Sequence, residues 1–183
     1  MMSPDEIQSI VADAECLHDR AAVSAAISDM ALDITTLLAH RNPVVLSVLN
    51  GGIFFTGELL LHLSFPLELD SIKAGRYQGE TRGATMRWQL APSIPLTGRT
   101  VLIVDDILDE GITLAEIKHF CHEAGAKDVF TAVLIDKQIG RDKPCQPDFV
   151  GLTTENRYLF GYGLDYKNYL RNWPGIYACK TID

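Results

Sequence analysis

Long apolar stretches are missing from this sequence of 183 residues. The longest uninterrupted apolar runs have four residues, at 101–104 and 132–135, whereas a helix that crosses a membrane needs about 20. The sequence therefore predicts no membrane span. Residues 1–6 carry neither the basic segment nor the apolar segment that characterises a secretion signal. We expect a cytoplasmic protein.

Cysteine is scarce and widely spaced, and no Cys-x-x-Cys pair occurs among Cys16, Cys121, Cys145 and Cys179. This spacing disfavours a zinc site or a disulfide framework, so we expect reduced thiols. Basic residues are in the minority, since 16 Lys and Arg face 24 Asp and Glu for a formal net charge of −8. That sign disfavours nucleic-acid binding. An anionic substrate must be received by local groups, namely backbone amides, a few Lys or Arg side chains and a divalent cation.

The fingerprints of two common nucleotide-binding folds are also missing. No Gly-Lys dipeptide occurs, which excludes a Walker A loop, and the glycines at 161–163 lack the continuation of a dinucleotide-binding G-x-G-x-x-G turn. His119, Cys121 and His122 lie close enough in sequence to form half of a metal site, but no further ligands accompany them. We interpret these three residues as structural.

The rest of the composition is that of one globular domain, with 47% hydrophobic and 22% charged residues over 1–183. Ser3, Pro4 and Glu6 have the spacing of a helix N-terminus. Further along, apolar residues recur at the helical period and alternate with short buried runs. We predict helices at 4–17, 20–40, 53–63 and 114–124, strands at 44–49, 67–73, 100–104 and 129–135, and a mobile loop at 74–85.

This alternation favours an α/β fold with a mainly parallel central sheet flanked by helices, whose ligand site lies beyond the carboxyl ends of the strands. At that place the strand at 100–104 is followed by Asp105, Asp106 and Asp109, and Gly111 and Thr113 open a helix. The N–H groups at the helix start would hold a phosphate, and the adjacent carboxylates would hold sugar hydroxyls or Mg²⁺. From the residues alone, a capped turn with solvated acids stays open as an alternative.

An acidic pair after a strand also occurs in receiver domains and phospho-transfer phosphatases, but those place it after an early strand. Here the order is four apolar residues, two acids, two apolar residues, Asp, any residue, Gly, any residue and Thr. This order resembles the phosphoribosyl-diphosphate (PRPP) motif of type I phosphoribosyltransferases. Residues 147–151, 157–166 and 171–172 resemble the 6-oxopurine branch, the hypoxanthine-guanine phosphoribosyltransferases. With 49–52 and 136–137, the resemblance covers about residues 44–175.

The resemblance implies the type I phosphoribosyltransferase fold, with N-terminal helices at 4–40 and a small purine-binding hood at 147–183. It implies transfer of the phosphoribosyl group from PRPP to hypoxanthine or guanine with Mg²⁺, giving IMP or GMP and pyrophosphate. Asp109 would be the general base near purine N7, and Lys137 would donate to purine O6. The other implied roles are the ribose hydroxyls and the metal for Asp105 and Asp106, the 5′-phosphate for Glu110, Gly111, Ile112 and Thr113, pyrophosphate for Gly51, Gly52 and Arg171, the purine for Tyr158, Leu159 and Asp165, a second metal position for Asp165, and the mobile loop for Tyr77.

Three residues depart from the family pattern. Asn50 stands where lysine is frequent, Arg76 stands where serine is usual, and Glu110 replaces a small hydroxylic residue beside the phosphate site. An inward Glu110 carboxylate would repel a phosphate, so we expect it to face solvent. Two alternatives stay open: a xanthine-preferring relative, and a non-catalytic regulator that senses PRPP or nucleotide. The resemblance also implies a homo-oligomer, either a dimer or a tetramer.

Overall fold

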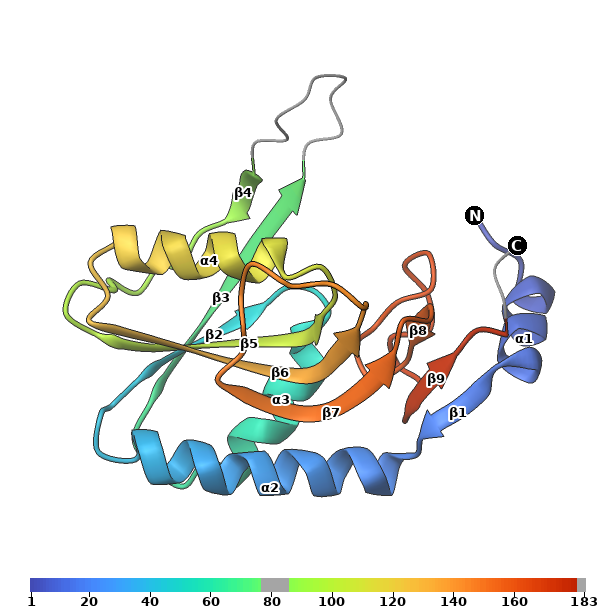
Figure 1. Cartoon of the computed structure of the whole chain (residues 1–183), viewed down its shortest axis with the longest axis horizontal. Coiled ribbons are helices and arrows are strands. Elements are labelled where there is room, and N and C mark those ends of the chain that lie inside the picture. Colours follow the sequence, from blue (N-terminus) through green and yellow to red (C-terminus); the bar gives the residue numbers. More distant parts are fainter. Residues whose placement is uncertain (77–85, 181–183) are drawn as a thin grey trace.

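The computed structural model of the chain describes residues 1–76 and 86–180. Its main body is a six-stranded sheet in the order β4-β3-β2-β5-β6-β7, parallel throughout except for the pair of β3 and β4. Figure 1 shows helices packed along this sheet and a smaller sheet beside it. The large sheet and its helices comprise α2 (Arg20–Leu38), β2 (Val44–Val48), α3 (Gly52–His62), β3 (Glu68–Arg76), β4 (Met86–Leu90), β5 (Thr100–Leu108), α4 (Ile112–Glu123), β6 (Asp128–Gln138) and β7 (Phe149–Glu155).

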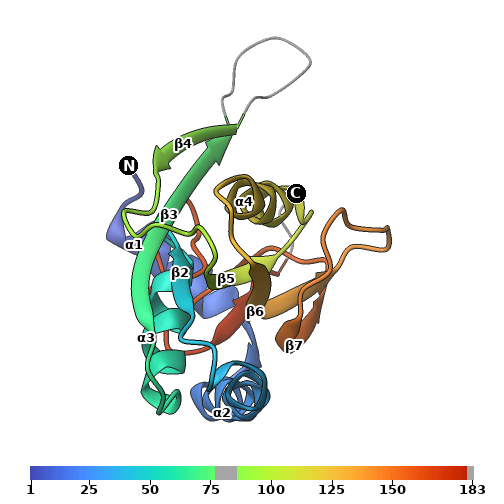
Figure 2. The same cartoon turned by 90° about the vertical axis from the view of Figure 1, so that its left-hand side faces the viewer.

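The central strands are apolar on both sides, which is why helices cover both faces of the sheet. Along β5, Leu102 and Val104 belong to a core shared with α2 and α3, whereas Val101 and Ile103 belong to a core shared with α4. Figure 2 shows α4 on one side of the sheet and α2 and α3 on the other. With both faces covered, the carboxyl ends of the parallel strands are the place where the sheet can meet a ligand.

The small antiparallel sheet has the order β1-β9-β8 and consists of β1 (Glu15–His18), β8 (Leu159–Phe160) and β9 (Ile176–Ala178). Glu15 and Leu159 lie on opposite sides of the same β9 residue, Ala178. Helix α1 (Pro4–Asp13) precedes this sheet. The Ser3 side chain accepts from the Glu6 N–H, and the Glu6 carboxylate accepts from the Ser3 N–H at 2.6 Å. The predicted helix start is therefore confirmed.

The expected α/β fold with a mainly parallel sheet is confirmed, but several boundaries were wrong. The first helix ends at Asp13 instead of residue 17, because residues 15–18 pair with β9. Strand β5 continues to Leu108 instead of ending at residue 104, because it stays paired with β6 over that length. Residues 149–155, expected in the hood, pair with β6 in the large sheet.

The predicted mobile loop at 74–85 divides into two parts. Ala74, Gly75 and Arg76 belong to β3, where they pair with residues of β4. They are part of the sheet and not of a loop. The remainder, including Tyr77, lies outside the described residues.

Helix α2 is the one helix within residues 1–76 and 86–180 that is long and apolar enough to cross a membrane, judged by length and composition. The apolar composition of α2 is also explained by its packing in the core of the domain. Val23, Ile27 and Ile34 are fully buried in the core that α2 shares with α3 and the sheet, while Asp29 and Asp33 are exposed on the outer side. One apolar face of α2 therefore belongs to the interior of the domain, with Val23, Ile27, Met30, Ala31, Ile34 and Leu38 buried.

This assignment makes Ile34 and Leu32 a matched pair on one helix. Ile34 is 0% exposed and Leu32 is 66% exposed. Ile34→Ala should lower the free energy of unfolding by about 2–5 kcal/mol through lost burial and a residual cavity, whereas Leu32→Ala should change it by less than about 0.5 kcal/mol. Urea unfolding followed by circular dichroism measures both values. Equal losses in the two variants would contradict the packing of α2.

Candidate active site

A cavity of about 550 Å³ lies where the carboxyl ends of β2, β5 and β6 meet the segment that follows β8. Nearly every site residue predicted from the sequence lines this cavity. The predicted residues in its lining are Gly51, Asp105, Asp106, Asp109, Glu110, Gly111, Ile112, Thr113, Lys137, Tyr158, Leu159, Asp165 and Arg171. Leu49, Asn50 and Leu164 also line it and were not among the predicted residues. All three lie in segments that carry the family resemblance, 49–52 and 157–166, but the resemblance assigned them no contact with a ligand.

Asp105 and Asp106 lie near the carboxyl end of strand β5, and each is only 9% exposed. The Asp106 N–H donates to Asp105 Oδ1 at 2.9 Å. Burial raises the pKa of Asp105 well above its usual range, and the neighbouring Asp106 charge raises it further. Burial also raises the pKa of Asp106, although a hydrogen bond with Asp105 and the Arg171 charge oppose that rise. Two buried carboxyl groups without a full countercharge are suited to receive a cation or hydroxyl donors.

The acid pair fits Mg²⁺, although it does not form a complete protein cage. In the described part of the chain, no three His, Cys, Asp or Glu residues gather into a group that could hold a metal ion. Asp165, the third predicted metal residue, instead accepts from Arg171 Nη2 at 2.6 Å and from the Asn168 N–H at 2.7 Å. Mg²⁺ commonly takes one or two protein carboxylates and completes its shell with substrate phosphates and water. Asp105 and Asp106 suffice for that arrangement.

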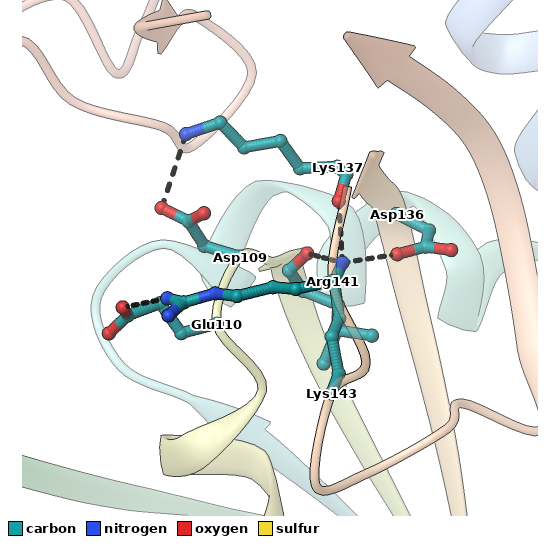
Figure 3. Close-up of polar contacts among 7 residues, drawn as sticks. Asp109, Glu110, Asp136, Lys137, Arg141 and Lys143 are labelled. Carbon is teal, nitrogen blue, oxygen red and sulfur yellow. Dashed lines mark hydrogen bonds and ion pairs between the residues drawn. The ribbon is translucent and has the colours of Figure 1, made fainter. Parts of the chain in front are cut away.

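Asp109 and Lys137 meet across the cavity from the ends of β5 and β6. Lys137 Nζ lies 3.2 Å from Asp109 Oδ2, and the two side chains are 12% and 50% exposed. Figure 3 shows the lysine reaching over the loop after β5 to this carboxylate. A proton acceptor and a proton donor therefore lie within reach of one ligand, as the predicted roles require.

Residues 110–113, predicted to hold the 5′-phosphate and called the phosphate loop below, follow β5 and open α4. Gly111 caps this helix with a φ of +77°, a left-handed conformation that favours glycine. The first N–H groups of the helix have no partners within it, so they can bind an anion. Beside them, the Glu110 carboxylate accepts from Arg141 Nη2 at 2.5 Å (Figure 3). The expected solvent-facing side chain is therefore held by a basic residue, which offsets its charge near the phosphate position.

The turn at 49–52 approaches the acid pair and the hood so closely that glycine is required. A Cβ on Gly51 would lie 1.8 Å from Asp106 Oδ2, and a Cβ on Gly163 would lie 2.1 Å from the Gly51 carbonyl oxygen. Arg171 Nη1 donates to the Gly163 carbonyl at 2.6 Å. This contact places the Arg171 side chain beside the turn, as expected of a pyrophosphate site. Gly52 is not in the cavity lining; it is buried at the start of α3, where a Cβ would lie 2.8 Å from the Val104 carbonyl.

Three of the predicted purine residues, Tyr158, Leu159 and Asp165, come from β8 and the residues on either side of it. The Tyr158 ring is 41% exposed and meets the Tyr166 ring edge-on, with 5.3 Å between centroids. Leu159 is buried and lies opposite Ala178 in the small sheet. The Tyr158 carbonyl accepts from the Cys179 N–H at 3.0 Å. The small sheet thus fixes the backbone that carries an open aromatic face, which is what stacking on a planar base requires.

The buried acid pair leads to a prediction about stability and pH. The pKa of Asp105 is raised in the folded state, so ionising it costs stability as the pH rises through that pKa, and the cost is absent at acid pH where the group is protonated in both states. Asp105→Asn keeps the Oδ1 acceptor for the Asp106 N–H. In metal-free buffer this variant should unfold at higher urea than the wild type at about pH 8, and the difference should shrink toward about pH 4.

The control for this measurement is Asp33→Asn, because Asp33 is exposed on α2. Its urea midpoint should follow the wild-type curve at every pH. An Asp105→Asn protein that is less stable than the wild type at pH 8 would contradict the raised pKa.

Comparison with known proteins gives one consistent result. The family model of the phosphoribosyl transferase domain matches residues 13–167. A hypoxanthine-guanine-xanthine phosphoribosyltransferase of Tritrichomonas foetus is 36% identical over 167 residues, 90% of each chain, and a hypoxanthine-guanine phosphoribosyltransferase of Lactococcus lactis is 36% identical over 141 residues, 76% of each chain. A solved hypoxanthine-guanine-xanthine phosphoribosyltransferase superposes with a TM-score of 0.84 at 31% identity, covering 92% of this chain and 99% of its own. The chain belongs to the phosphoribosyl transferase domain family and is an enzyme of that family.

Proposed function

We propose that this enzyme serves purine salvage by transferring the 5-phosphoribosyl group of PRPP to hypoxanthine or guanine. The bond between ribose C1 and the pyrophosphate oxygen breaks, its electron pair leaves with pyrophosphate, and a bond forms between C1 and a ring nitrogen of the purine. The purine loses one ring proton to Asp109, and the products are IMP or GMP and pyrophosphate. One observation carries the proposal: Asp109 and Lys137 meet at 3.2 Å in the cavity that also holds the acid pair and the phosphate loop.

The base would lie between the hood and the end of β6. The exposed Tyr158 ring offers a stacking surface, and the Lys137 ammonium offers a donor to O6 of a 6-oxopurine. The backbone of Leu159 and the Asp165 carbonyl would read the remaining edge of the base. Adenine carries an amino group in place of O6, so the lysine would face a second donor in a desolvated pocket. The proposed site therefore selects 6-oxopurines.

PRPP would lie along the carboxyl end of β5. The N–H groups from Gly111 to Thr113 would hold the 5′-phosphate, and Asp105 and Asp106 would hold the ribose hydroxyls and the cation. Arg171 and the Gly51 N–H would receive pyrophosphate. When bound, Mg²⁺ would spread the negative charge that develops on the leaving pyrophosphate. This arrangement supplies locally the positive charge that a protein of net charge −8 lacks overall.

We further propose that residues 1–183 act as a single domain in a cytoplasmic homo-oligomer. The four cysteines are free thiols, which suits a reducing compartment. Ile53, Phe54 and Leu61 are 49%, 42% and 85% exposed on α3. Large apolar side chains grouped on one helix support contact with another copy of the chain.

The four-base assay is the main test of this function. Pyrophosphate release from saturating PRPP is measured with hypoxanthine, guanine, xanthine and adenine, with Mg²⁺ and in excess chelator. The first two bases should exceed xanthine by at least about tenfold in kcat/KM, because the Asp165 carbonyl would repel the second oxo group of xanthine. Adenine should not react, and the chelator should abolish activity.

Three results would redirect the assignment. Efficient use of xanthine would favour the alternative that the name of the Tritrichomonas foetus relative raises. Comparable use of adenine would mean that Lys137 does not face the base. Absence of activity with every base would favour a non-catalytic regulator.

Asp109→Asn separates proton acceptance from the geometry of the site. An asparagine oxygen can still accept from Lys137, so PRPP affinity should be unchanged, while kcat should fall by about 10²–10⁴, the usual contribution of a general base. Steady-state kinetics and equilibrium dialysis of PRPP measure the two quantities. Asp142→Asn is the control, since Asp142 is exposed nearby and does not line the cavity. Wild-type turnover in Asp109→Asn would remove the base role.

A further inference from the structure

Lys143 lies in the irregular segment between β6 and β7, and no family motif includes it. Its side chain is only 7% exposed. The ammonium donates to the Leu108 carbonyl at 2.8 Å, to the Lys137 carbonyl at 2.6 Å and to Asp136 Oδ1 at 2.6 Å (Figure 3). A lysine has three N–H donors, so all of them are used. A surface lysine that only provides solubility would show neither the burial nor the complete set of partners.

The three partners of Lys143 belong to the carboxyl ends of two neighbouring strands. Leu108 of β5 and Asp136 of β6 are the last residues that the two strands place opposite each other. Asp109 follows Leu108, and Lys137 follows Asp136. Lys137 Nζ lies 3.2 Å from Asp109 Oδ2. The ammonium therefore holds the two backbones together at the point where their own ladder ends and the reactive side chains begin.

The aliphatic part of Lys143 also contacts the phosphate loop. A Cβ on Gly111 would lie 3.2 Å from Lys143 Cβ and 3.4 Å from Pro144 Cδ, so the bare glycine backbone packs directly against this segment. The same segment carries Arg141, which binds Glu110 at 2.5 Å, with side chains that are 65% and 39% exposed. Exposed ion pairs hold geometry weakly. The buried Lys143 therefore holds the segment between β6 and β7 against the phosphate loop more firmly than the ion pair of Arg141 with Glu110 does.

We propose that Lys143 is a positioning residue for the transferase reaction: it fixes the Asp109 carboxylate and the Lys137 ammonium relative to each other. The inference rests on the proposed function, since it assigns Lys143 to the proton acceptor and the O6 donor of that reaction. A compact ammonium can point its donors in three directions at once, which neither a neutral side chain nor a planar guanidinium reproduces. Displacements of about 1 Å at reacting groups can cost about 10²-fold in rate.

Lys143→Met tests the role, because methionine keeps an unbranched apolar chain one atom shorter than lysine and removes all three donors. We expect kcat to fall at least about tenfold and KM for hypoxanthine and guanine to rise. The dissociation constant of PRPP should stay within about twofold, because methionine keeps the Cβ that packs against Gly111, and the acid pair and Arg171 keep their contacts. Lys127→Met is the matched control, since Lys127 is exposed and distant from the cavity lining.

A second variant keeps the test decisive if the unpaired Asp136 carboxylate destabilises the single variant. Asp136→Asn combined with Lys143→Met removes that charge, so the urea midpoint should recover while kcat and the KM for the base stay impaired. A purely structural lysine would instead regain turnover together with stability, and that result would overturn the proposal. Equal weakening of PRPP and base binding would also overturn it.

The design separates this inference from the proposed function. Wild-type protein that is inactive with both hypoxanthine and guanine would overturn the proposed function and the role of Lys143 with it. Active wild-type protein together with a Lys143→Met protein of unchanged kcat and base KM would overturn only the positioning role.

Discussion

The parallel pairing of β5 with β6 decides where the proposed proton acceptor Asp109 and the proposed O6 donor Lys137 lie. The two strands keep one register from Thr100 opposite Asp128 to Leu108 opposite Asp136. Their pairing ends at Leu108 and Asp136, although β6 continues to Gln138, and the next residues along the two backbones are Asp109 and Lys137, whose side chains are in contact. Burial of β5 on both faces makes a slip of this register costly, because every apolar side chain would change sides.

The site also depends on how charge is distributed over an acidic protein. Asp105 and Asp106 are buried at the cavity floor, and each acid nearer the surface has its own basic partner. Lys137 meets Asp109, Arg141 meets Glu110, and Arg171 meets Asp165. This pairing leaves the inner two acids as the pair suited to bind a cation. A strongly negative overall field is thus compatible with an anionic substrate, because the decisive charges act over a few ångströms.

Much of the fold and of the cavity lining could be predicted from the sequence, because both depend on local patterns. The helix start at Ser3 follows from capping chemistry, and α2 follows from its apolar period. The end of β5 was predicted four residues early, since acids inside a buried strand look like the start of a loop. Strand β1 was missed because Glu15 to His18 show no alternation, and their strand conformation depends on pairing with β9.

The functional residues divide in the same way. Asp109, Lys137 and Arg171 lie in motifs and reach the cavity as predicted. Lys143 could not be found from the sequence, because its three partners lie on two strands and only the folded backbone brings them to one ammonium. Gly52 is the opposite case. The family resemblance implied that it contacts pyrophosphate, whereas the fold buries it against the Val104 carbonyl, where it has a packing role.

The small sheet has a consequence for the order in which the enzyme is completed during synthesis. Its strand β1 is synthesised early, but among the described residues it pairs with β9 alone, and β9 in turn pairs with β8. A contact so distant along the chain closes late, because the loop entropy must be lost before the pairing is gained. On the ribosome, β2, β5 and β6 can form the PRPP side of the cavity while Glu15 to His18 still lack a partner. The half of the site that would recognise the base is then the last to form, and a nascent chain stopped before residue 176 would hold a phosphate loop without a pocket for a purine.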